Sequence, residues 1–319
     1  METPTSIPIQ SNSPMNNKAN QSSGQFADFF QNTSNLIQPN TNSQNIQSNE
    51  DKSDTFSNQK YIQNDDKNNN NGQNGKRNSK KEIIKPPSLK LLFISNSITN
   101  PVEEVTLTPN SLKKRDGNVI IKSPSHKFSF GKDPDNDCVL PDSNLAGKQF
   151  FVFYNETTSK FNVLDNLSGT GLFVKIENSL IINHDMIVSF CADHMYLQVT
   201  KNSNNSKDIR IKFLQGKRYR DSTFNSDFKK IITIGRGNKC DIKYDGDSVS
   251  KIHCTIKFID DNWVMYDGTF ANHEQKKSTN GLWLLANVGI ELNNKMLLTS
   301  GIYKIKVEIE EPSKSLQQL

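Results

Sequence analysis

Hydrophobic residues are scarce in this sequence: they occupy 33% of its 319 positions, whereas ordinary domains have roughly 45–50% when Gly is counted. No apolar run approaches the ~18 residues of a membrane-spanning helix, so we expect no transmembrane segment. The N-terminal residues also lack the apolar core of a secretory signal, which favours an intracellular protein, nuclear or cytoplasmic. The length indicates about two domains, so part of the chain must dilute the composition.

Cysteine is also rare, and its spacing excludes several chemistries. The four cysteines include no Cys-x-x-Cys pair, and no histidine stands at zinc-finger spacing. We therefore expect reduced thiols, no metal and no cofactor. The formal net charge of +5 is too small over this length to indicate nucleic-acid binding by itself.

The dilution lies at the N-terminus. About a third of the first 80 residues are Asn or Gln, and aromatic residues are few there. Such a segment buries too little apolar surface to offset an ordering cost of roughly 1–2 kcal/mol per residue. Residues 1–87 are therefore predicted to form a disordered arm.

After this arm, short β-rich runs alternate with clusters of Asn, Asp, Gly and Pro. Examples are Leu91–Ile94, Phe128–Phe130 and Gln149–Phe153. No amphipathic helical pattern longer than two turns is present in this part of the sequence. The folded part is therefore predicted to be all-β, a sandwich or a barrel.

Part of this β-rich region repeats at an offset of 104 residues. The matched pairs are Gly131 and Gly235, Lys132 and Arg236, Asp137 and Asp241, Ala146 and Ser250, and Gln149 and His253. Two further strands are predicted to close each copy. These are Met186–Phe190 with Met195–Thr200, and Met296–Thr299 with Ile302–Ile309. We predict two tandem β domains, residues 88–201 and 207–312.

The second copy carries three polar motifs in a fixed order. Gly235-Arg236 ends one strand, and Ser250-Lys251-Ile252-His253 begins another. Ser278-Thr279-Asn280-Gly281 occupies a loop before the next strand. In type, order and spacing these motifs resemble the forkhead-associated (FHA) domain over about residues 207–312. The resemblance implies a β-sandwich whose loops at one end bind phosphothreonine peptides.

The chemistry of phosphate binding explains these residue types. A phosphomonoester carries about −1.5 to −2 charges and three acceptor oxygens, so its site needs cations and neutral donors on rigid strands. Arg236 offers a planar fork of donors, and Lys251 adds a mobile second charge. The resemblance implies that Arg236, Ser250 and Thr279 contact the phosphate. It also implies that Asn280 holds the peptide main chain.

The resemblance further implies that Gly235 and His253 brace the loops without touching the ligand, and Gly281 is assigned with them to support of the site. The pair His253-Cys254 is also compatible with a metal site or a Cys/His nucleophile. No third partner stands at a recognisable spacing, so we expect neither.

Each motif alone has an ordinary explanation. Arg236 is compatible with a solvated surface charge, and Ser250 and Asn280-Gly281 with turns. Their ordered conjunction favours the phosphate site.

The first copy resembles the same domain over about residues 88–201 but lacks most of the donors. Lys132 replaces the arginine, Ala146 the serine and Gly147 the following cation. Gln149 stands in place of the histidine, and Thr170 in place of the asparagine. Because each lost charge-assisted hydrogen bond is worth about 1.5–3 kcal/mol, we predict a structural or protein-contact domain. The alternative is a weak anion site formed by Lys132, Lys148, Ser168 and Thr170.

Together these features predict a non-enzymatic adaptor that binds phosphothreonine-containing proteins through its second FHA-like domain. The sequence has no kinase glycine loop, His-Arg-Asp triplet, Walker sequence or Cys/His ring. One alternative is a structural scaffold without phosphate dependence. Another is a weak nucleic-acid binder that uses Lys217–Arg220 and the region of Lys80 and Lys81, although these patches are short. The threonines of the arm further indicate self-association, since a phosphorylated arm fits the second domain of another copy.

Overall fold

The computed structural model describes residues 81–95, 101–183, 185–191, 193–214, 221–271 and 274–317. Within these ranges the regular structure consists of strands, without a helix. The predicted all-β, sandwich-like class is therefore confirmed for this part of the chain. Residues 1–80 of the predicted arm and the basic patch Lys217–Arg220 lie outside the described residues. The end of the predicted arm is described, and there Lys81–Lys85 forms a strand, so disorder up to residue 87 was wrong for this segment.

A twelve-stranded sheet runs through the molecule. Its strands, in their order across the sheet, are β15 (Asp221–Asn225), β14 (Lys207–Phe213), β13 (Asp193–Lys201), β12 (Met186–Phe190), β22 (Leu282–Leu285), β10 (Phe173–Lys175), β24 (Leu297–Ser300), β25 (Tyr303–Glu310), β2 (Ser88–Ser95), β3 (Pro101–Thr108), β4 (Ser111–Lys114) and β5 (Val119–Ile121). Pairing within this sheet is antiparallel throughout its described registers.

Two five-stranded sheets share one topology, each with a single parallel pair. One has the order β23 (Ile290–Glu291), β9 (Lys160–Asp165), β8 (Phe150–Asn155), β6 (Phe128–Gly131) and β7 (Cys138–Val139). The other has the order β11 (Ser179–Ile181), β19 (Asn262–Asp267), β18 (Cys254–Ile259), β16 (Ile231–Gly235) and β17 (Ile242–Lys243).

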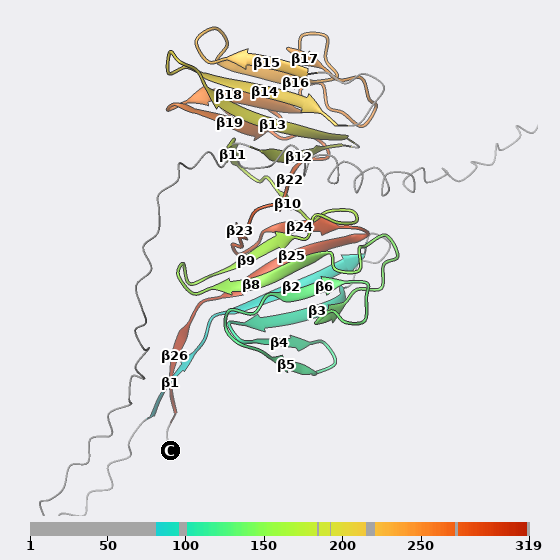
Figure 1. Cartoon of the computed structure of the whole chain (residues 1–319), viewed down its shortest axis with the longest axis vertical. Helices are drawn as coiled ribbons and strands as arrows, with labels where there is room; N and C mark the ends of the chain where they lie inside the picture. Colours follow the sequence, from blue (N-terminus) through green and yellow to red (C-terminus); the bar gives the residue numbers. More distant parts are fainter. Residues whose placement is uncertain are drawn as a thin grey trace, which may run out of the picture.

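Each five-stranded sheet packs on its own part of the long sheet and encloses a hydrophobic core, so two sandwich-like bodies lie one above the other (Figure 1). We call the cluster around Phe93, Phe130 and Phe150 the first core, and the cluster around Phe213 and Trp263 the second core. Alternation along the strands accounts for both cores. Every second residue at the start of β25 is buried, and the residues between them are exposed lysines and a glutamate.

The two cores combine strands from distant parts of the chain. β24 and β25, at the C-terminal end, line the first core, where they pair with β10 and β2. β12 and β13 line the second core, where they pair with β22 and β14. The second core is therefore continuous in sequence, from Ile176 to Leu282, whereas the first core joins residues on both sides of it.

The two packed bodies do not coincide with the two predicted domains, residues 88–201 and 207–312. The predicted closing strands are present, but each pair packs against the five-stranded sheet of the other range. Hydrophobic alternation defines which face of a strand is buried, not which sheet the strand joins. The sequence pattern therefore predicts the strands without predicting their partners.

β10 and β22 connect the two cores and lie between the two bodies (Figure 1). Beyond their pairing, Ile176 N–H donates to Leu282 O at 2.9 Å, and Ala286 N–H donates to Leu172 O at 2.9 Å. Hydrogen bonding thus continues from one core to the other. Two short ribbons complete the described structure: β1 (Lys81–Lys85) with β26 (Ser313–Gln317), and β20 (Thr269–Ala271) with β21 (Glu274–Lys276).

The aromatic stack of the first core gives a stability prediction. Phe150 is 1% exposed and stacks on Phe130 with ring centroids 4.7 Å apart. Phe150→Ala is expected to lower the free energy of unfolding by about 3–5 kcal/mol, through lost burial and a residual cavity. The control Phe228→Ala removes a ring that is 90% exposed and should change stability by less than about 0.5 kcal/mol. Urea unfolding followed by circular dichroism measures both variants, and equal losses would contradict the assignment.

Candidate functional site

The three motifs of the second core meet at one end of its sandwich, where β16 ends and where β18 and β22 begin. The loop after β16 is attached to the loop before β18 by backbone hydrogen bonds. Arg236 N–H donates to Ser250 O at 3.1 Å, and Gly237 N–H donates to Lys251 O at 2.9 Å. Residues that are well separated in the sequence are thus held side by side.

Two hydroxyl groups lie together at the surface of this end. The Oγ of Ser250 and the Oγ1 of Thr279 are 3.4 Å apart, and Thr279 N–H donates to Ser250 Oγ at 3.2 Å. The side chains of Arg236 and Lys251 are exposed beside these loops. Neither forms a side-chain hydrogen bond or ion pair with another described residue. The site therefore offers two cations and two hydroxyls to a ligand from solvent.

Asn280 is exposed and is held at two points. Its Nδ2 donates to Ser248 O at 2.9 Å, and its main-chain carbonyl accepts a hydrogen bond from Trp283 Nε1 at 3.1 Å. The side-chain amide is thus oriented across the loop that precedes Ser250.

His253 braces the loops from below and is fully buried. Its Nδ1 accepts a hydrogen bond from Ser250 N–H at 3.2 Å, and its Nε2 lies 3.3 Å from both Gly281 O and Ser278 Oγ. Burial lowers the pKa of His253 below its ordinary value of 6.5. The imidazole is therefore neutral at neutral pH, with the proton on Nε2 donated to the loop before β22.

The two supporting glycines have distinct geometric reasons. At Gly235 an added Cβ would lie 2.5 Å from Lys251 O and 2.9 Å from His253 N, so only glycine permits the close approach of the loops. Gly281 has a φ of +72°, in the left-handed region that favours glycine. Gly235 thus allows two loops to approach each other, and Gly281 allows the chain to turn. Both lie next to the groups that hydrogen-bond to His253.

Sequence reasoning missed one wall of this end, the turn between β12 and β13. The Sγ of Cys191 donates to Ser248 O at 3.3 Å and lies 3.6 Å from Nδ1 of His253 and 3.9 Å from Nδ2 of Asn280. The Phe190 ring packs on the His253 ring with centroids 4.5 Å apart. No motif identifies this turn, because its residues lie about 60 positions before the histidine that they contact.

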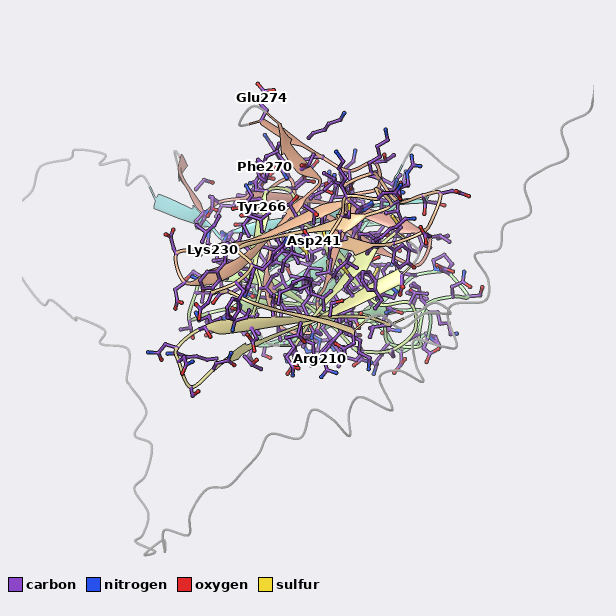
Figure 2. All side chains as sticks on the ribbon, turned by 90° about the horizontal axis from the view of Figure 1, so that it is seen from above. Arg210, Lys230, Asp241, Tyr266, Phe270 and Glu274 are labelled. Carbon is purple, nitrogen blue, oxygen red and sulfur yellow. The ribbon has the colours of Figure 1, made fainter. Side chains whose placement is uncertain are left out.

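The segment before the Ser278 motif forms the hairpin β20–β21. Figure 2 shows Phe270 and Glu274 on this hairpin, which projects beyond Tyr266. The ammonium group of Lys257 lies 3.8 Å from the centroid of the Phe270 ring, and this contact packs the hairpin onto β18. Lys277, which follows the hairpin, is paired with Glu177 at 2.8 Å.

The corresponding end of the first core has the same brace with a different side chain. Gln149 is fully buried, and its Oε1 accepts from Ala146 N–H at 2.9 Å while its Nε2 donates to Ser168 O at 2.7 Å. Its Nε2 also lies 3.3 Å from Asp165 Oδ2, and burial raises the pKa of Asp165 to about 7. Gln149 thus makes the loop contacts that His253 makes in the second core.

The polar residues of this first-core end are paired with other protein groups. Lys132 Nζ donates to Ser143 O at 3.3 Å, and Lys148 is paired with Asp135 at 3.0 Å. Ser168 Oγ donates to Lys148 O at 2.9 Å, and Thr170 Oγ1 accepts from Gly301 N–H at 3.1 Å. This end therefore has no pair of facing hydroxyls beside unpaired cations like that of the second core.

Among the described residues no cluster of three or more His, Cys, Asp or Glu side chains is arranged to hold a metal ion. The described part of the chain also contains no helix long and apolar enough to cross a membrane. Its four cysteines are free thiols.

Comparison with known protein families identifies part of this region. Residues 232–302 match the FHA domain. The matched range includes all three motifs, and the FHA domain is a phosphopeptide-recognition module, not a catalytic one. A comparison with curated proteins finds no match to this sequence.

The buried imidazole of His253 gives a prediction about pH dependence. Gln149, its counterpart in the first core, suggests the variant that tests it. His253→Gln is expected to fold and to retain the loop hydrogen bonds, because glutamine already makes them in the first core. Since the pKa of His253 is lowered in the folded state, acidification below pH 6.5 protonates the unfolded state first. Acidification should therefore lower the free energy of unfolding of the wild-type protein more than that of the His253→Gln variant.

Urea unfolding at neutral pH and at about pH 5.5 measures this difference. Other buried groups titrate in both proteins, so the comparison isolates His253. The same pH-dependent loss in both proteins would contradict a neutral, buried imidazole.

Proposed function

We propose that the second core binds phosphothreonine peptides and that the protein is a non-enzymatic adaptor between proteins. The observation that carries this proposal is the geometry at Ser250 and Thr279. Their hydroxyls lie 3.4 Å apart, within the range that matches the FHA domain. They stand beside the exposed Arg236 and Lys251, whose side chains have no partner among the described residues.

Charge and geometry support a dianionic ligand. A phosphate of about −2 charges accepts hydrogen bonds through three oxygens, and the site supplies hydroxyl donors and cations of two different shapes. Arg236 suits bidentate contact, whereas Lys251 acts as a point charge. Asn280, anchored to Ser248 O at 2.9 Å, is placed to contact the peptide main chain. These contacts recognise a phosphorylated side chain on an extended segment.

In the same proposal the first core is a degenerate tandem copy that acts as a structural or protein-contact domain. Its polar groups are committed to neighbouring protein atoms, and Ala146 has no hydroxyl to offer. A phosphorylated N-terminal arm would supply a ligand for the second core of another copy, which makes self-association part of this proposal.

The direct test uses the full chain and a fluorescent phosphothreonine peptide library, with each peptide paired to its unphosphorylated twin. We expect at least one phosphopeptide to bind much more tightly than its twin. A structural scaffold without phosphate dependence predicts no difference. A nucleic-acid binder predicts instead a steep salt dependence on random sequence.

Arg236→Ala tests the proposed phosphate contact. We expect phosphopeptide affinity to fall by about 1.5–3 kcal/mol, which is roughly 10- to 150-fold, because a charge-assisted hydrogen bond is lost. Lys132→Ala removes the exposed cation at the matching position of the first core and should leave affinity unchanged. Isothermal titration calorimetry on both variants decides the point, and an unchanged affinity for Arg236→Ala would rule out direct contact.

A further inference from the structure

We propose that the chain is an internally exchanged pair of FHA-like sandwiches, in which each copy supplies its C-terminal hairpin to the core of the other. The phosphopeptide site is then completed by residues of the first copy. The exchange rests on strand pairing and packing, and only the nature of the ligand rests on the proposed function.

The first observation is that the two hairpins make equivalent pairings in opposite cores. In the C-terminal part of each copy, matching residues are 110 positions apart, as Gly171 and Gly281 are. Leu197 on β13 lies opposite Ile211 on β14, and its counterpart Val307 on β25 lies opposite Leu91 on β2. The registers agree, so the same sandwich is built twice with the hairpins interchanged.

The family match supports the same conclusion. Residues 232–302 match one FHA domain, yet within that range Leu282 belongs to the second core and Leu292 and Leu298 belong to the first. A single sequence domain thus contributes to two packed bodies. The crossover is the β10–β22 pair, in which Val174 lies opposite its own counterpart, Leu284.

The turns explain why each hairpin prefers the other core. Gly301 has a φ of +56°, and a Cβ there would overlap the carboxylate of Asp142 and lie 2.9 Å from Leu145. Its counterpart in the other hairpin is Cys191, which has a Cβ. The first-copy hairpin therefore does not fit the first core without displacing Asp142, whose Oδ2 accepts from Ile302 N–H at 2.9 Å.

The residue before each turn also fits only one of the two cores. Phe190 is fully buried in the second core, where its ring packs against Phe213 and Tyr244 with centroids 5.8 and 5.3 Å away. Its counterpart Ser300 is 2% exposed, and its Oγ donates to Gly171 O at 3.0 Å. Returning the hairpins would place a serine in an aromatic cavity and a phenylalanine against a buried carbonyl, and both changes are unfavourable.

A third pair of matching residues, Asp193 and Tyr303, involves a buried carboxylate. Asp193 is 1% exposed in the second core, where its Oδ2 accepts from Tyr244 OH at 2.9 Å. The residue that matches Tyr244 in the first core is Leu140, which offers no donor. In the first core Asp193 would also replace Tyr303, which packs edge-on against Phe93. The Oδ1 of Asp193 would keep its hydrogen bond from His194 N–H, but its buried Oδ2 would lose the hydroxyl donor of Tyr244, which is unfavourable.

The exchange makes the candidate phosphate site composite. Cys191 and Phe190 contact His253, and Cys191 also contacts Ser248 O, the atom that anchors Asn280. We infer that Cys191 is a positioning residue, which acts on the ligand through the Asn280 amide and the loop before Ser250.

Crosslinking in the full chain tests the exchange. Lys90 lies opposite Glu308, and Gln198 lies opposite Arg210, at a separation that a disulfide spans. The double variants Lys90→Cys with Glu308→Cys, and Gln198→Cys with Arg210→Cys, should close within one chain on mild oxidation. The unexchanged arrangement would instead pair position 90 with 198 and position 210 with 308. Peptide mass spectrometry and non-reducing gels identify the bonds.

The proposal predicts closure of the first two variants and none in Lys90→Cys with Gln198→Cys or in Arg210→Cys with Glu308→Cys. Closure of these latter pairs, failure of the first two to close, or a product of twice the chain mass would each overturn internal exchange. This experiment involves no ligand. If the first two pairs close and no phosphopeptide binds, the proposed function fails and the exchange stands.

Phosphopeptide titration tests the positioning role. Cys191→Leu is expected to weaken binding about tenfold, because the larger side chain displaces the Asn280 amide. Cys191→Ser keeps a donor of similar size and should retain wild-type affinity. Both variants are compared at a temperature at which their circular dichroism shows them folded. If the wild type binds the phosphopeptide and Cys191→Leu binds it equally tightly, the positioning role is wrong. That result leaves the exchange of hairpins untouched.

Discussion

The site depends on one buried, neutral side chain that hydrogen-bonds to two loops. His253 accepts from the loop before β18 and donates to the loop before β22, and the two hydroxyls at the surface are positioned by those loops. Gln149 hydrogen-bonds to the two corresponding loops in the first core. The brace is therefore separable from the proposed ligand contacts: the loop frame is present in both cores, whereas one core has exposed cations without a partner among the described residues.

Local patterning predicted most of the fold. β2, β6, β8, β12, β13, β24 and β25 all lie where short β-rich runs predicted strands, because such a run is a property of a few consecutive residues. The partner of each strand is not local. Val307 and Leu197 have the same side-chain character on equivalent strands, so the choice between β2 and β14 depends on contacts at distant turns, such as Asp142 beside Gly301.

Residue type and order in the sequence predicted which loops of the candidate site lie together, and their role in binding stays a prediction. Arg236, Ser250 and Thr279 were identified by motif, and the folded chain brings their loops together. The turn at Phe190 and Cys191 was not identified, because neither residue type signals a ligand site. Its role depends on a ring contact and a weak thiol hydrogen bond that exist only after β12 packs beside β22.

The two cores differ in how the charged side chains at their loop ends are paired. In the first core Lys148 is neutralised by Asp135 at 3.0 Å, and the carboxylate of Asp133 lies against Gly147, the counterpart of Lys251. In the second core Arg236 and Lys251 face solvent without an acidic partner among the described residues. Charges that are already paired gain little from an incoming anion, whereas unpaired charges on a rigid frame gain a full interaction. In the proposed function, affinity for phosphate is therefore concentrated at one end of one sandwich and does not depend on the small net charge of the chain.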